Sequence, residues 1–129
     1  MILRLLSLIL IAFAWTPASA AELLREFSGT AGTTTTEFEV EAPWILDWRV
    51  NSDYRPSMAI EVHLVDGVTG LHEGLLLKII YPDPYDRLDG VKLFDEGGRY
   101  RFRVSSTFAR WNLKVIELTE DEAALYTPR

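Results

Sequence analysis

The segment 81–89 carries side chains whose types and spacing suit ligand binding. Asp83, Asp86 and Asp89 recur at every third position in a loop that also contains two prolines. Carboxylate oxygens suit Ca²⁺, which takes about six to eight oxygen ligands, so backbone carbonyls and water would complete such a site. The loop lacks the ligand spacing and the glycine of an EF-hand. The sequence is therefore compatible with a calcium site, and a solvated acidic loop is the alternative.

The same segment presents tyrosines beside these carboxylates. Tyr81 and Tyr85 lie in or next to the loop, and Tyr54 lies in an earlier one. An aromatic face stacks on the CH groups of a sugar ring, while neighbouring carboxylates accept hydroxyl protons. These residues therefore predict a carbohydrate-binding loop, against the simpler interpretation of ordinary surface tyrosines.

Three arginines, Arg99, Arg101 and Arg103, alternate with apolar residues and so share one face of a predicted strand. Such a row could bind phosphate, sulfate or an acidic glycan. It could also pair with an acidic strand, which the chain offers in Glu37, Glu39 and Glu41. We favour the cross-strand ladder because the two strands match in alternation. A charge reversal at Arg101 should then be rescued by the opposite change at Glu39.

The two histidines, His63 and His72, do not by themselves predict a site. A zinc site needs at least three protein ligands, and no nucleophile elbow accompanies the histidines. We expect both to be exposed and without a role. The chain has no cysteine, so thiol catalysis and thiolate metal sites are excluded, and no set of acid, base and nucleophile predicts an enzyme.

Residues 1–20 have the features of a secretory signal peptide. Arg4 precedes an apolar run from Leu5 to Trp15, and Pro17 precedes the small residues of Ala18-Ser19-Ala20. The run is shorter than the roughly 20 residues of a membrane span. We expect cleavage before Ala21, a periplasmic or secreted product, and no stable membrane insertion after cleavage.

Charge and length narrow the function classes further. The chain has 129 residues and a net charge of −6; without residues 1–20 it has 12 basic and 19 acidic residues, a net −7. An acidic chain disfavours nucleic acid as a partner. The remaining length fits one domain over residues 21–118, followed by a tail or short helix over 119–129.

The segment from Trp44 to Val50 is the centre of the predicted fold. Trp44, Leu46, Trp48 and Val50 share one face of a strand, and Trp111 lies on the apolar face of a later one. Two indoles bury roughly 400 Å², which requires a second layer of structure. We expect all three tryptophans in the core.

Short alternating segments with turn residues between them recur along the whole chain. They predict seven or eight strands in an all-β, antiparallel, jelly-roll-like β-sandwich. Segment 75–81 is apolar on both faces except at Lys78, which fits a strand buried on both sides or a short helix; its length and the flanking Gly74 and Pro82 favour the strand. Segment 88–94 predicts a weak strand that Asp89-Gly90 breaks. Thr119 and Glu122 have capping-box spacing, compatible with a short C-terminal helix, although the chain end favours fraying.

Four segments together resemble a class of small exported bacterial β-sandwiches. They are Phe38-Glu-Val40, Trp44-Ile-Leu46-Asp-Trp48, Gly98-Arg-Tyr100-Arg-Phe102-Arg-Val104 and Trp111-Asn-Leu113-Lys-Val115. The class is similar in outline to pre-peptidase C-terminal domains. The resemblance implies an exported accessory or binding module and gives no catalytic residue to transfer. We expect a non-enzymatic module without a cofactor, whose partner is another exported protein or a glycan. A carbohydrate- or calcium-dependent binding domain using loop 81–89 is the alternative.

Overall fold

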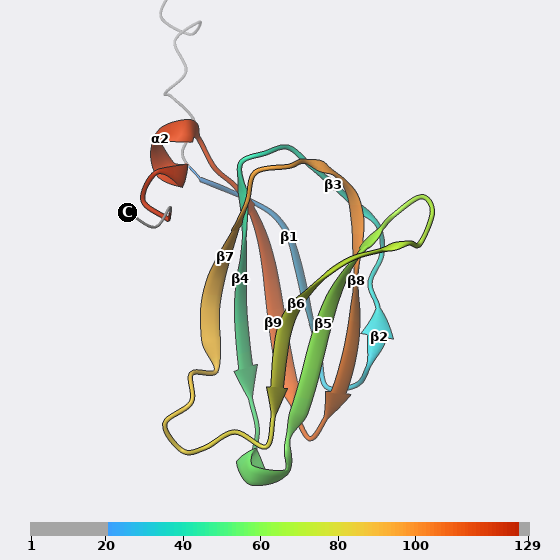
Figure 1. The fold of residues 1–129 in the computed structure, drawn as a ribbon, viewed down its shortest axis with the longest axis vertical. Coiled ribbons are helices and arrows are strands. Elements are labelled where there is room, and N and C mark those ends of the chain that lie inside the picture. The colour runs from blue at the N-terminus through green and yellow to red at the C-terminus, as the bar shows by residue number, and fades with distance from the viewer. Residues whose placement is uncertain (1–20, 127–129) are drawn as a thin grey trace, which may run out of the picture.

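The computed structural model describes residues 21–126, and the elements below lie within that range (Figure 1). The strands are β1 (Glu22–Gly29), β2 (Thr33–Thr34), β3 (Phe38–Val40), β4 (Trp44–Asn51), β5 (Ala59–Asp66), β6 (His72–Ile80), β7 (Asp89–Phe94), β8 (Gly98–Thr107) and β9 (Arg110–Glu117). A 3₁₀ turn, η2 (Arg55–Ser57), precedes β5, and helix α2 (Glu120–Ala123) follows β9.

The strands form two antiparallel sheets, which confirms the predicted all-β sandwich. One sheet has the order β1-β9-β4-β7, and the other has the order β2-β8-β5-β6 with β3 also beside β8. Since β2 and β3 both pair with β8, they are two pieces of one interrupted strand. The chain then has eight strands paired first with last, second with seventh, third with sixth and fourth with fifth. A long antiparallel ribbon rolled up in this way is a jelly roll.

Thr35 explains the interruption between β2 and β3. Its backbone N–H donates to the Phe102 carbonyl at 2.9 Å, while its hydroxyl accepts from the Phe102 N–H at 3.0 Å. The side chain thus replaces a backbone carbonyl in the ladder with β8. The two pieces stay attached to the same strand although the regular pairing is broken.

Trp44 anchors the interior between the sheets. It is fully buried, and its ring stacks on Phe94 with centroids 3.9 Å apart and an interplanar angle of 8°. The indole N–H donates to the Glu96 carbonyl at 2.9 Å. The polar end of the ring is therefore satisfied while its faces contribute to the core.

Trp48 departs from the expectation that all three tryptophans are core residues. Trp44 and Trp111 are buried, but Trp48 is only half-buried. The reason is position: Trp48 lines a hollow with Leu77 of β6 and Gly90 of β7, the outer strands of the two sheets on one side. The sandwich has no further strand there to seal the ring.

Gly90 does not weaken β7, contrary to expectation. The strand runs from Asp89 to Phe94, and Gly90 lies opposite Trp48. A Cβ at position 90 would be 2.7 Å from Cζ2 of the indole. Glycine is therefore the residue that lets this ring lie against the neighbouring strand.

The segment 75–81 is a strand, but the expected burial on both faces is wrong. β6 is an edge strand, within which only Leu77 is buried, and Leu75 and Ile80 are exposed. A strand with apolar residues on both faces stays partly exposed when no strand pairs with one of its edges and no layer packs on its outer face, as is the case for β6. The pairing of β5 with β6 shifts register twice, between Val62 and His63 and between Leu64 and Val65.

The acidic and basic strands are neighbours, as expected. Glu39 lies opposite Arg99 in the β3–β8 register, with Oε2 and Nε 3.7 Å apart. Glu37 approaches both Arg99 at 3.8 Å and Arg101 at 4.0 Å. The expected rescue partner of Arg101 is corrected: it is Glu37 and not Glu39. Within residues 21–126, Glu41 forms no ion pair.

The C-terminal segment forms the capping box and packs rather than frays. The Thr119 hydroxyl accepts from the Glu122 N–H at 3.2 Å, and the Glu122 carboxylate accepts from the Thr119 N–H at 2.9 Å. The bond from the Thr119 N–H holds the pKa of the Glu122 carboxyl below its ordinary value. The carboxylate also accepts from the Ala21 N–H at 2.8 Å, and Ala123 is buried. α2 therefore closes over the start of the described chain.

The predicted signal peptide, residues 1–20, lies outside the described residues, as do residues 127–129. Among the described residues, none of the helices has the length and apolar character that a membrane crossing requires.

Trp44 and Trp48 make a matched test of burial, because they occupy one face of the same strand. We expect Trp44→Ala to lower the free energy of unfolding by about 3–5 kcal/mol. The loss caused by Trp48→Ala should be smaller than this by about 1 kcal/mol or more. Urea denaturation followed by circular dichroism measures both. Equal losses would contradict the half-buried position of Trp48.

The charge ladder predicts a specific rescue. Arg99→Glu should lower the free energy of unfolding, and adding Glu39→Arg should restore about 0.3–1 kcal/mol of the loss. Glu41→Arg, placed one strand residue beyond the ladder, is the matched control and should restore less. Equal rescue by both changes would mean that net charge, rather than the β3–β8 register, governs the effect.

Candidate functional site

One end of the sandwich gathers four connections, and we call it the loop end (Figure 1, bottom). They are residues 30–32 between β1 and β2, 52–58 between β4 and β5, 81–88 between β6 and β7, and 108–109 between β8 and β9. Antiparallel strands that end on the same side bring these distant segments together. Two of these connections, 52–58 and 81–88, are the longest between strands in the described chain.

Exposed aromatic side chains concentrate at the loop end. Five aromatic residues count among the exposed large hydrophobic side chains of the described chain, and four of them lie here: Tyr54, Tyr81, Tyr85 and Phe108. Tyr85 is 96% exposed. Tyr54 and Phe108 contact each other, with ring centroids 5.4 Å apart. The three tyrosines were recognisable from the sequence as candidate ligand contacts, but Phe108, in the short turn between β8 and β9, was not.

Tyr81 and Phe108 also share an unusual backbone conformation. Their φ angles are 49° and 52°, and they are the non-glycine residues with positive φ in the described chain. This left-handed region is unfavourable for bulky residues, and strain of this kind concentrates at binding and catalytic sites. At the loop end, two aromatic residues therefore have a backbone conformation that is intrinsically unfavourable for them.

Arg55 ties the connections of the loop end together. Its guanidinium donates to the Asp83 carbonyl, with the closer contact at 2.9 Å, and to the Asp86 carbonyl at 2.5 Å. The Tyr81 N–H donates to the Met58 carbonyl at 2.9 Å, and the Ser52 hydroxyl donates to the Phe108 carbonyl. Hydrogen bonds thus fix segment 52–58 to both the 81–88 loop and the β8–β9 turn.

An ion pair borders the Tyr54 and Phe108 rings, which are tilted by 55° to each other. Arg110 contacts Asp53 through two hydrogen bonds of 3.0 and 3.2 Å, which hold the pKa of the Asp53 carboxyl below its ordinary value. With Tyr54 and Phe108, this pair lines a hollow of about 220 Å³. The combination of aromatic faces and fixed charged groups suits a ligand that is part apolar and part polar.

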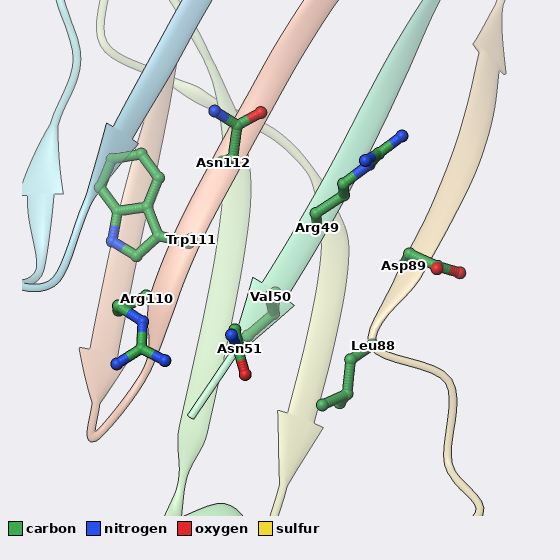
Figure 2. Close-up of a pocket in the computed structure, with 8 residues that line it drawn as sticks. All are labelled: Arg49, Val50, Asn51, Leu88, Asp89, Arg110, Trp111 and Asn112. Atoms are coloured by element: carbon green, nitrogen blue, oxygen red, sulfur yellow. The ribbon is translucent and has the colours of Figure 1, made fainter. Parts of the chain in front are cut away.

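A second hollow of about 410 Å³ adjoins the first, since Arg110 lines both. Figure 2 shows that its lining comes from the ends of β4, β7 and β9 nearest the loop end. Its polar side chains are Arg49, Asn51, Asp89, Arg110 and Asn112, with Leu88 and Trp111 beside them. Amides, a carboxylate and guanidinium groups supply donors and acceptors in one shallow surface.

Two of the three aspartates predicted as calcium ligands, Asp86 and Asp89, use their carboxylates in other contacts. The Asp86 carboxylate accepts from the Asp83 N–H at 2.8 Å, which closes a turn, and Asp89 lies 3.3 Å from Arg87. No group of three or more histidine, aspartate or glutamate side chains among residues 21–126 is placed to hold a metal ion. The geometry of the loop thus favours a structural role for Asp86 and gives no support to a three-carboxylate calcium site.

The three arginines of the predicted row have different neighbours. Arg99 and Arg101 lie beside Glu37 and Glu39, as described above. Arg103 lies between Thr34 and His63 in the sheet register and forms no ion pair in the described part of the chain. Most of the row therefore takes part in the ladder rather than forming an open anion strip.

The histidines are brought together, which sequence analysis did not foresee. Nδ1 of His63 lies 2.9 Å from Nε2 of His72 on the outer face of the β5–β6 hairpin. The two positions flank the Asp66-Gly67 turn, which was the signal for this pairing. Because the pairing of β5 with β6 shifts register twice, the spacing of the two histidines in the sequence does not predict that their side chains meet.

No protein family model matches the chain, and neither the curated proteins nor the solved structures include a significant match.

The bonds of Arg55 predict how the 81–88 loop depends on it. We expect Arg55→Ala to accelerate hydrogen exchange of the Tyr81, Asp83 and Asp86 amides by about tenfold, because the loop loses its attachment to η2. Exchange followed by mass spectrometry or NMR measures this. Arg87→Ala is the control, since Arg87 forms its ion pair with the exposed carboxylate of Asp89 rather than with the backbone of the 81–88 loop. Equal effects would show that loop charge, and not the Arg55 contacts, sets the protection.

Proposed function

We propose that the chain is an exported, non-enzymatic binding module that takes an oligosaccharide at its loop end. The observation that carries the proposal is the concentration of exposed aromatic side chains there, two of them on left-handed backbone. Exposed aromatic rings are costly in water and useful against the apolar faces of sugar rings.

The polar groups around these rings support a sugar ligand. Asn51, Asp89 and Asn112 line the larger hollow and offer both donors and acceptors, which hydroxyl groups need. The smaller hollow places the Tyr54–Phe108 pair next to it. A sugar chain crossing the two would stack on the rings and hydrogen-bond to the amides and the carboxylate.

The fixed loops favour tight binding. Arg55 and Ser52 hold segments 52–58, 81–88 and 108–109 in one arrangement before any ligand arrives. Side chains and loops that are already ordered lose less entropy on binding. The loop end is therefore suited to recognition through a largely preformed surface.

The electrostatics support binding rather than acid–base catalysis. Asp53 has a lowered pKa because Arg110 donates two hydrogen bonds to it. A carboxylate stabilised in this way is a weak proton acceptor at neutral pH. The same pair provides a fixed wall for the smaller hollow.

Export is the part of the proposal that rests on sequence. Arg4, the apolar run and Ala18-Ser19-Ala20 have the order of a cleavable signal, which directs the product to the periplasm or the outside of the cell. The resemblance to exported β-sandwich modules supports the same location. An accessory role toward another exported protein is the second form of this proposal, and the exposed edge of β6 is the feature that favours it.

The aromatic residues provide the test. Glycan-array screening of the purified chain, followed by calorimetric titration with the best ligand, should give saturable binding. Tyr54→Ala and Phe108→Ala should each weaken it at least about tenfold, because each removes a stacking surface, while the melting temperature changes little.

The matched control is Val68→Ala, which removes an exposed apolar side chain from the β5–β6 turn at the opposite end. It should leave the affinity unchanged. The absence of any glycan ligand, or equal binding by the Tyr54, Phe108 and Val68 variants, would overturn the sugar assignment.

A further inference from the structure

The outer face of the β5–β6 hairpin holds a second cluster, separate from the loop end. It consists of Glu61, His63 and His72, with Lys78 at its border. His63 and Glu61 lie on β5, and His72 and Lys78 lie on β6. Two imidazole nitrogens that face each other at 2.9 Å are the central feature.

We propose that His63 and His72 bind one divalent late-transition-metal ion, with Cu²⁺ as the best fit. The ligand atoms are Nδ1 of His63 and Nε2 of His72, and water completes the coordination. This site is independent of the sugar-binding proposal.

The distance between the two nitrogens favours one coordination geometry for the metal ion. With metal–nitrogen bonds of about 2.0–2.1 Å, nitrogens 2.9 Å apart subtend an angle of about 90° at a shared ion. This is the angle between adjacent ligands in a square-planar or tetragonal site, which Cu²⁺ and Ni²⁺ prefer. A tetrahedral Zn²⁺ site would require the rings to move apart. Among divalent ions, Cu²⁺ also has the highest intrinsic affinity for nitrogen ligands.

Glu61 orients the first histidine. Its Oε2 lies 3.5 Å from Nε2 of His63, the ring nitrogen that faces away from His72. A carboxylate on the far nitrogen favours a proton there and leaves Nδ1 as an electron-pair donor, the arrangement common behind metal-bound histidines. Glu61 is thus a positioning residue, itself held by Lys78 at 3.5 Å.

His72 changes its tautomer on binding. With the proton of His63 on Nε2, beside Glu61, the hydrogen bond between the rings is the one that Nε2–H of His72 donates to Nδ1 of His63. Metal binding requires that this proton leave Nε2, and the neutral ring then carries its proton on Nδ1. The ion thus replaces one hydrogen bond between two side chains that are already neighbours, and the rings turn so that both lone pairs point at the ion. The side chain of His72 is exposed, which leaves the ion open to water.

The experiment titrates Cu²⁺ into the untagged full chain, because a histidine tag would bind the metal itself. We expect one bound ion, an electron paramagnetic resonance spectrum with two nitrogen ligands, and a rise in melting temperature. His63→Ala and His72→Ala should each abolish the two-nitrogen spectrum. Glu61→Gln should weaken binding by about tenfold while both nitrogens remain ligands.

Glu73→Gln is the matched control, because Glu73 is next to His72 in sequence but lines a hollow with Tyr100 instead. It should bind Cu²⁺ as the unaltered chain does. If His63→Ala fails to fold, the exposed His72→Ala variant decides the question. The proposal is overturned if the unaltered chain binds no Cu²⁺, if His72→Ala keeps the two-nitrogen spectrum, or if the spectrum shows oxygen ligands alone.

Discussion

Burial of the Trp44 ring is the constraint on which the other features of the structure depend. The ring lies between the sheets, with Phe94 stacked on one face, Phe38 at an edge-on angle and its N–H bonded to the Glu96 carbonyl. Removing so large a surface from water supplies much stabilisation without any disulfide. The sheets that enclose this ring also fix where each strand ends, and hence which connections meet at the loop end.

Alternation along the chain predicted the sandwich well, because every side chain on a strand must face either the core or solvent. It failed where burial depends on a strand's place in the sheet. Leu75 and Ile80 are as apolar as true core residues, yet they lie on the outer strand β6. Trp48 lies on β4, directly beside the outer strand β7, where its ring is only half covered. No local pattern distinguishes an edge from a centre. Gly90 was misjudged for a related reason, since its neighbour Trp48 is distant in sequence.

The candidate sites were only partly accessible from sequence. Tyr54, Tyr81 and Tyr85 could be selected by residue type, but Phe108 joins them only because two connections meet at one end of the jelly roll. Asp83, Asp86 and Asp89 show the converse, because regular spacing in a loop does not make side chains converge. The contact between His63 and His72 depends on how β5 and β6 pair, and the two register shifts in this pairing are not predictable from the sequence pattern.

The interrupted pairing of β5 with β6 has a consequence for how copies of the chain meet. β6 presents an apolar outer strand, the kind of surface along which sheets from separate molecules join. An incoming strand needs a long, even row of backbone groups, but the regular stretch of β6 spans only Leu77 to Ile80 before the register shifts. Bulges bend and twist a strand and so spoil it as a template. The irregularity that positions His63 and His72 thereby also shortens the part of β6 along which a strand from another molecule could pair.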